Sequence, residues 1–157
     1  MLKKLILFCL LILGLSCAKD DKREKEIAEI PVEVKVTRFD EKFAQATADS
    51  LPRLKSQFPY LFPTEFPDSV WIAKMSDSIQ LELNQEVARE YTDITDVKQD
   101  LESLFQHVRY YFPETQIPEV VMLTSDVDYR NKAVWTDELL LISLDTYLGK
   151  GHHFYVG

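Results

Sequence analysis

The side chains best suited to metal chemistry in this 157-residue chain are three histidines, His107, His152 and His153. A catalytic zinc site typically needs two histidines one helical turn apart and a third ligand further along the chain. The sequence contains no HExxH motif. His152 and His153 are adjacent, so a regular element would point them in different directions, and His107 lies at the border of a predicted apolar helix face. The sequence therefore predicts no metal site and no cofactor.

Two carboxylates, Asp126 and Asp128, alternate as the first ligands of an EF-hand calcium loop do. Arg130 occupies the next alternate position, the sixth position lacks glycine, and Asp137 stands where the loop needs glutamate. We therefore expect the two aspartates to accept hydrogen bonds from turn amides, and one of them to pair with Arg130. The chain also lacks a glycine-rich phosphate loop and a G-x-S-x-G nucleophile elbow. No catalytic residue is predicted.

The first seventeen residues are MLKKLILFCLLILGLSC. They contain a basic segment, then an apolar segment, then small residues, which is the order found in a secretory signal peptide. The apolar run, residues 5–15, is shorter than the roughly 20 residues that span a bilayer. The triplet that ends at Cys17 resembles a bacterial lipobox, although Gly14 replaces the common leucine. This resemblance implies a lipoprotein signal peptide over residues 1–16 and an acyl chain such as palmitate on Cys17. An uncleaved anchor, or a plain signal with an incidental cysteine, is the alternative.

The composition of the remaining chain restricts the partners that it can bind. Removal of residues 1–16 from the 157 leaves 141 residues with 16 basic and 26 acidic side chains, a formal charge of −10. An acidic surface argues against nucleic acid and anionic lipid headgroups as partners, so the membrane would be reached through the lipid on Cys17. Because Cys9 leaves with the signal, no free cysteine remains for a disulfide or thiolate site.

The length predicts a single domain after the charged N-terminal part. Residues 17–30 are expected to be the acylated cysteine and a flexible charged tether, because residues 18–29 contain one large apolar residue, Ile27. A solvated helix is the alternative. The domain is expected over residues 31–157. Its first elements are predicted as a strand over 31–38, a helix over 40–48 capped by Asp40, and a helix over 51–57 capped by Ser50.

Residues 58–67 contain three prolines and four aromatic residues. This proline spacing excludes a continuous helix or strand. The exposed aromatic side chains of Tyr60, Phe62 and Phe66 could form a recognition surface for a partner. The other interpretation is a packed loop whose aromatic rings close the edge of the core.

Hydrophobic periodicity predicts the rest of the chain. A helix is expected from Asp68, with one apolar stripe formed by Trp71, Ile72, Met75, Ile79 and Leu83. A second helix is expected over residues 96–112, with one apolar face formed by Val97, Leu101, Leu104, Phe105, Val108 and Phe112. A strand is then expected over 117–124. Residues 133–135 and 139–144 read as two strands joined by a turn. The predicted fold class is therefore α+β, with an N-terminal strand, several amphipathic helices and a small mixed sheet that contains a β-hairpin.

Residues 125–149, SDVDYRNKAVWTDELLLISLDTYLG, resemble the gliding motility lipoprotein GldB family. The segment LFQHVRYYFP at residues 104–113 and the lipobox at Cys17 fit the same family, whereas His153 stands where we expect proline. The resemblance implies a cell-envelope lipoprotein required for gliding motility, in the inner or outer membrane and facing the periplasm or the surface. It implies a structural or interaction subunit of the gliding and secretion machinery, without an enzymatic role.

The same resemblance implies that the chain is the N-terminal part of a longer domain. The family is distantly similar to predicted zinc proteases, so a metallopeptidase-like enzyme with its zinc motif beyond residue 157 is one alternative. A solute-binding lipoprotein is another, although the chain is short for two lobes. For an interaction subunit, the candidate partner surface consists of Tyr60, Phe62, Phe66, Asp126, Asp128 and Arg130.

Overall fold

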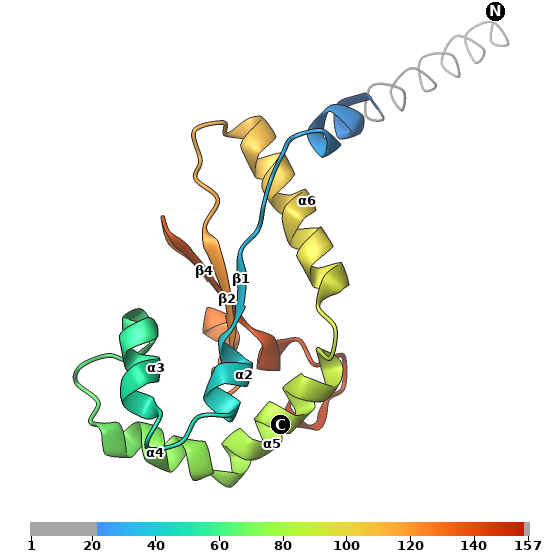
Figure 1. Ribbon diagram of the computed structural model, residues 1–157. Helices are drawn as coiled ribbons and strands as arrows, with labels where there is room; N and C mark the ends of the chain where they lie inside the picture. The colour runs from blue at the N-terminus through green and yellow to red at the C-terminus, as the bar shows by residue number, and fades with distance from the viewer. Residues whose placement is uncertain (1–21, 156–157) are drawn as a thin grey trace, which may run out of the picture. The chain divides into compact units, whose positions relative to one another are not determined.

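The computed structural model of this chain describes residues 22–155 (Figure 1). The predicted signal peptide and Cys17 lie outside these residues. The chain divides into two compact units, which are described separately. Unit 1 comprises the described part of Met1–Glu33 together with Asp96–Ile117, and unit 2 comprises Val34–Thr95 and the described part of Pro118–Gly157. Among the described residues, no helix has the length and apolar character to cross a membrane.

Unit 1 contains a short helix at residues 22–28 and nearly all of α6 (Thr95–Tyr111). The helix at 22–28 lies within the predicted tether and corresponds to the helical alternative for that segment. Its one large apolar side chain, Ile27, is fully buried, which stabilises the helix by about 1.5–3 kcal/mol. The amide of Gln106 also donates to the carbonyls of Ala28 and Ile30 at 3.1 and 3.2 Å.

The predicted helix over 96–112 is confirmed by α6 to within one residue at each end. Leu101 and Phe105 of its predicted apolar face are buried, whereas Leu104 and Phe112 are exposed. The predicted face was therefore too wide. Only a narrow stripe of this helix, at Leu101 and Phe105, is buried, and most of its surface faces water.

Unit 2 is built on a four-stranded sheet in the order β1-β2-β4-β3. The strands are β1 (Val36–Arg38), β2 (Glu119–Leu123), β3 (Ala133–Trp135) and β4 (Leu139–Ser143). Strands β1, β2 and β4 run parallel to one another. Strand β3 pairs with β4 as an antiparallel hairpin. This mixed sheet with surrounding helices confirms the α+β class. The first strand is shorter than predicted because only Val36 to Arg38 pair with β2.

One face of the sheet carries the aromatic core of unit 2. Val121 of β2 is buried there against side chains from α2 (Phe39–Ala44), α3 (Leu51–Gln57) and the loop that follows. The core cluster consists of Phe39, Phe43, Leu51, Leu54, Phe58, Phe62 and Val121. Phe39 packs edge-on against the rings of Phe58 and Phe62, with centroids 5.2 and 5.9 Å apart. Edge-to-face geometry is the favoured arrangement of such pairs.

The predicted caps of the two short helices were wrong in their chemistry. Asp40 lies in the first turn of α2 and accepts hydrogen bonds from Arg38. Ser50 does occupy the N-cap position of α3, but its side chain caps no amide of that helix. Its hydroxyl instead accepts the N–H of Thr47 at 2.8 Å. Both side chains therefore accept hydrogen bonds from residues that precede their helices, Arg38 at the end of β1 and Thr47.

The helix predicted from Asp68 is two helices, α4 (Asp68–Ser76) and α5 (Ser78–Glu90). Asp77 separates them with an extended backbone (φ −68°, ψ 133°), and its carboxylate accepts the N–H groups of Ile79 and Gln80 at 3.0 Å. Ile72 and Ile79 are exposed, so the single apolar stripe predicted across both helices was wrong at these two positions. The 3₁₀ turns are η1 (Pro59–Leu61), η2 (Tyr129–Asn131), η3 (Leu144–Thr146) and η4 (His153–Tyr155).

Candidate functional site

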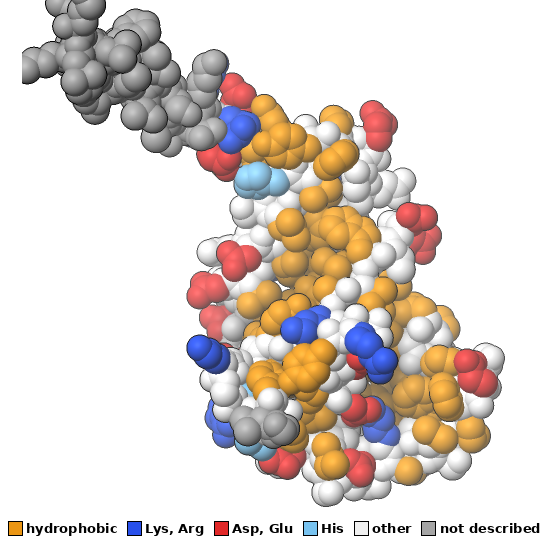
Figure 2. All heavy atoms as spheres, turned by 180° about the vertical axis from the view of Figure 1, so that it is seen from behind, with side chains coloured by type: hydrophobic (Ala, Val, Ile, Leu, Met, Phe, Trp, Pro, Cys, Tyr) orange, Lys and Arg blue, Asp and Glu red, His pale blue; other side chains and the backbone are white. Residues whose placement is uncertain are grey.

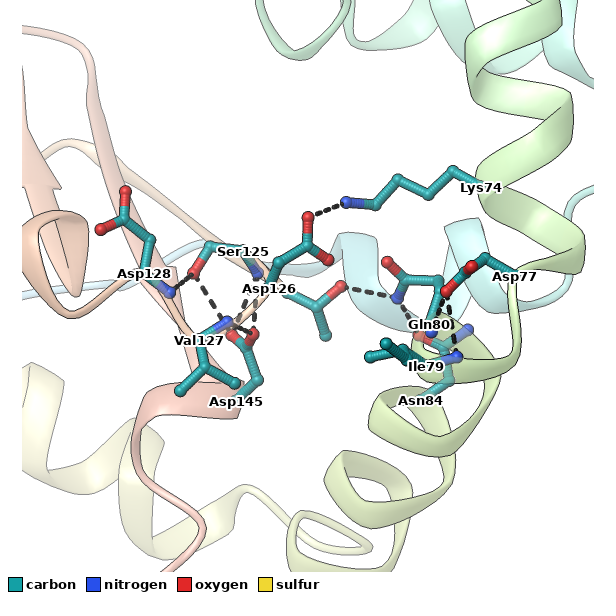
Figure 3. Close-up of polar contacts among 11 residues, drawn as sticks. Lys74, Asp77, Ile79, Gln80, Asn84, Ser125, Asp126, Val127, Asp128 and Asp145 are labelled. Atoms are coloured by element: carbon teal, nitrogen blue, oxygen red, sulfur yellow. Dashed lines mark hydrogen bonds and ion pairs between the residues drawn. The ribbon is translucent and has the colours of Figure 1, made fainter. Parts of the chain in front are cut away.

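The parallel strands of unit 2 end at a common edge that gathers polar side chains. In sheets of this kind, ligands usually bind outside the carboxyl ends of the strands. Arg38 ends β1, the loop of residues 124–128 follows β2, and Asp145 follows β4. Figure 3 shows how the loop and Asp145 face one another. This edge is therefore the first place to look for a functional site.

Asp145 organises this edge as a fully buried carboxylate. It accepts the N–H of Ser125 at 3.0 and 3.1 Å and the N–H of Val127 at 2.7 Å. Among the described residues, no cation forms an ion pair with it. Burial is the largest influence and raises the pKa of Asp145, while the backbone hydrogen bonds oppose this rise. Asp145 thus fixes the loop after β2 through main-chain contacts.

The loop that Asp145 holds has an uncommon backbone. Asp126 and Val127 have φ values of 56° and 58°, in the left-handed region that aspartate tolerates but the β-branched valine rarely adopts. Such residues cost on the order of 1–3 kcal/mol each, so the surrounding hydrogen bonds must hold them there. The Asp126 side chain points out of the loop toward α4, where its Oδ2 lies 2.6 Å from Lys74 Nζ (Figure 3).

Asp128 accepts hydrogen bonds from its own turn, which confirms the prediction for this residue. Its Oδ1 accepts the N–H of Arg130 at 3.0 Å, and its Oδ2 accepts the side-chain amide of Asn131 at 2.7 Å. The hydrogen bond from Asn131 is the largest influence that lowers the pKa of Asp128. Arg130 Nε lies 3.7 Å from Oδ1, so Asp128 is the predicted partner of Arg130. Asp126, Asp128 and Arg130 therefore share one loop.

The aromatic segment 58–67 combines both interpretations that the sequence left open. Phe58 and Phe62 are buried, with Phe62 only 4% exposed, so Phe62 cannot be part of a partner surface. It is buried because its ring packs edge-on against Trp71 at 4.8 Å and against Phe39. Tyr60 and Phe66 are 44% and 46% exposed. The accessible aromatic surface is therefore these last two side chains.

A pocket of about 200 Å³ lies beside the same aromatic cluster. Lys74 and Thr124 contribute polar groups, and the other lining side chains are apolar. The lining residues are Phe39, Phe43, Leu61, Trp71, Lys74, Leu123 and Thr124. The pocket therefore adjoins the loop after β2, through Thr124, and the exposed ring of Phe66, which packs against Trp71 at 6.2 Å.

The histidines are each engaged with a glutamate in the described structure. His107 Nε2 lies 3.0 Å from Glu24 in unit 1. In unit 2, Nε2 of His152 and of His153 lie 3.0 and 2.9 Å from Glu86 and Glu82 of α5. Within residues 22–155, no three His, Cys, Asp or Glu side chains form a group that could hold a metal ion.

Two residues of this edge were not predicted from sequence. Asp145 directly follows the apolar run LLLISL, and a lone acid at the end of a buried strand is a usable signal. Gln80 gives no such signal, yet it is fully buried and its amide donates to Asn84 at 2.7 Å and Thr124 at 3.1 Å (Figure 3). Gln80 therefore connects α5 to the residue after β2.

Comparisons with known proteins bear on the chain as a whole. The sequence model of a family described as "Gliding motility protein GldB" matches residues 20–157. This match confirms the resemblance that the motifs indicated, and it covers every described residue. No curated protein and no solved structure matches the chain.

Proposed function

Because this chain belongs to the gliding motility protein GldB family, we propose that it is a lipid-anchored structural or interaction subunit of the gliding machinery in the cell envelope. The observation that carries the proposal is the family match over residues 20–157. The lipobox at Cys17 supports anchoring to a membrane of the envelope by acyl chains. We further propose that the partners are other proteins of the gliding and secretion machinery, bound through surfaces of unit 2.

The exposed parts of the candidate surface suit a protein partner. Tyr60 and Phe66 are aromatic side chains with large exposed areas. Aromatic residues are enriched in the cores of protein–protein interfaces and among the residues that contribute most of the binding energy. The neighbouring apolar pocket has room for one apolar side chain of a partner. Asp126 and Arg130 are exposed and of opposite charge, so they suit the polar rim that surrounds such a contact.

Replacement of Cys17 with alanine is expected to abolish acylation and release the protein from the membrane. The reason is that the thiol of Cys17 would be the only attachment point for lipid after signal cleavage. Palmitate labelling and membrane fractionation of the full chain in gliding cells measure both effects. The Cys9→Ala variant is the matched control, because Cys9 lies in the predicted signal peptide. Equal labelling of the Cys17→Ala variant and the wild type would refute the anchor.

Replacement of Phe66 with serine is expected to reduce recovery of partner proteins and to slow gliding. This side chain is accessible, and truncation of a central interface aromatic commonly costs about 2 kcal/mol or more of binding energy. Cross-linking and pull-down from envelope extracts, quantified for gliding and secretion components, measure the effect. Phe112→Ser is the control, because Phe112 is an exposed phenylalanine of unit 1. If both variants recover the same partners as the wild type, Phe66 does not form the interface.

A further inference from the structure

A second recess of unit 2 combines aromatic rings with lysines and is not used by the proposed partner surface. It has a volume of about 380 Å³, within the roughly 300–1,000 Å³ typical of small-molecule sites. Three tyrosines and two lysines dominate its lining. The lining residues are Tyr129, Lys132, Thr146, Tyr147, Gly149, Lys150 and Tyr155.

The tyrosines of this recess provide exposed ring surface on a fixed wall. Tyr129 and Tyr147 are each about half exposed. Tyr155 is held in place, since its hydroxyl donates to the carbonyl of Asp145 at 2.8 Å and accepts the N–H of Leu148 at 2.7 Å. Its ring packs edge-on against Tyr129 with centroids 5.7 Å apart. The recess thus presents the accessible rings of Tyr129 and Tyr147 beside the ring of Tyr155, which two hydrogen bonds hold in place.

The two lysines bring positive charge to the recess, and the carboxylates of Asp145 and Glu90 lie close enough to act on the pKa of its Tyr155. Lys132 Nζ lies 5.2 Å from the ring centroid of Tyr129 and 5.9 Å from that of Tyr147, within the range of cation–π attraction. Within residues 22–155, neither Lys132 nor Lys150 forms an ion pair with a carboxylate. On the face seen in Figure 2, Lys and Arg side chains likewise lie among exposed hydrophobic side chains.

The backbone at the lip of the recess leaves room for a ligand. Gly149 has a φ of 97°, a conformation that side-chain-bearing residues rarely adopt. A Cβ placed on this glycine would meet no atom within 4 Å. The lip therefore borders open space, and it carries no side chain that would cover the neighbouring rings.

We propose that this recess binds an anionic saccharide, a sugar ring that bears a carboxylate or a phosphate. The C–H face of a sugar is apolar and flat enough to cover a tyrosine ring, while its hydroxyls match the polar tips of the tyrosines. The anionic substituent pairs with Lys132 and Lys150, where charged hydrogen bonds are the strong ones. An acidic peptide would satisfy the lysines but has no comparable flat face for Tyr129 and Tyr147.

Calorimetric titration of the detergent-solubilised full chain with two probes tests the proposal. One probe is a galacturonate trisaccharide, which carries carboxylates, and the other is glucose 6-phosphate. The neutral control is the methyl ester of the trisaccharide, and an oligoglutamate peptide represents an acidic segment. We expect at least one sugar probe to bind about tenfold more tightly than the ester, with an affinity that falls as salt is added.

Two single-charge variants assign the binding to this recess. Lys132→Gln and Lys150→Gln are each expected to weaken binding about tenfold, whereas Lys98→Gln, which removes a lysine of unit 1, leaves it unchanged. Lys150 is exposed, so its replacement reports on binding even if Lys132→Gln unfolds the protein. The proposal is overturned if neither sugar probe binds, if the ester binds equally well, if oligoglutamate binds more tightly than both sugars, or if the unit 2 variants bind like the wild type.

Discussion

Replacement of Asp40 with alanine is expected to lower the free energy of unfolding by about 3–5 kcal/mol, the usual cost of removing one partner of a buried ion pair. Asp40 is buried and binds Arg38 in bidentate fashion, with Nε–Oδ1 and Nη2–Oδ2 distances of 2.9 and 2.7 Å. Arg38 Nη1 also donates to the carbonyl of Tyr91 at 2.9 Å. Arg38 therefore connects the end of β1 to the end of α5, and loss of Asp40 leaves its largely buried guanidinium with only the half-exposed carboxylate of Glu41, at 3.0 Å, as an ion-pair partner among the described residues.

Urea unfolding followed by circular dichroism measures this effect. Two further variants test whether the burial of the ion pair is its cause. Asp68→Ala removes one partner of the more exposed pair with Lys55, which should cost about 1 kcal/mol or less. Replacing both partners, as Arg38→Met with Asp40→Leu, should cost less than Asp40→Ala because the buried guanidinium is removed together with its buried partner. Equal losses for Asp40→Ala and Asp68→Ala would show that the buried pair contributes no more than a surface pair.

The second large effect is expected for Asp145. Replacement with alanine leaves the N–H groups of Ser125 and Val127 without their acceptor and should lower the free energy of unfolding by about 2–4 kcal/mol. Asp126→Asn is the matched control in the same loop: it removes the exposed charge, which should contribute about 1 kcal/mol or less, and asparagine tolerates the φ of 56° at this position. A loss for Asp145→Ala no larger than for the control would contradict the role assigned to the buried carboxylate.

The raised pKa of Asp145 adds a pH dependence to this prediction. A group whose pKa is higher in the folded state binds its proton more tightly there. Its contribution to stability is complete below the unfolded pKa, near 3.8, and is lost as the pH rises through the folded pKa. The stability difference between wild type and Asp145→Asn should therefore be larger at pH 4 than at pH 7. The opposite trend would mean that the backbone hydrogen bonds outweigh burial.

The elements predicted correctly from sequence are those with a strong local pattern. The period of α6 and the apolar runs of β2 and β4 lie within continuous segments, so local periodicity was enough to find them. The break at Asp77 was missed because the apolar stripe continues across it. An aspartate that caps a helix looks the same in sequence as an aspartate on an exposed helix face.

The candidate site was harder to predict because it depends on contacts between distant segments. Asp126, Asp128 and Arg130 were found since they are close in sequence. The role of Asp145 requires that β4 lie beside β2 in parallel, and no local pattern sets that register. The burial of Phe62 depends in the same way on Trp71, which belongs to a different helix. Residue type alone could not separate Phe62 from its exposed neighbours Tyr60 and Phe66.

The interruption at Asp77 gives α5 an N-cap of its own, separate from α4. The carboxylate of Asp77 satisfies the first amides of α5, so α5 keeps its first turn even when α4 unravels. α4 contains no fully buried residue, and regions with few buried contacts open at low free-energy cost. Local opening of α4 would break the contacts of Trp71 and Met75 with the core cluster and the ion pair of Lys74 with Asp126, but it would leave the capped first turn of α5 in place. The exposed aromatic surface beside α4 can thus adjust its shape to a binding partner.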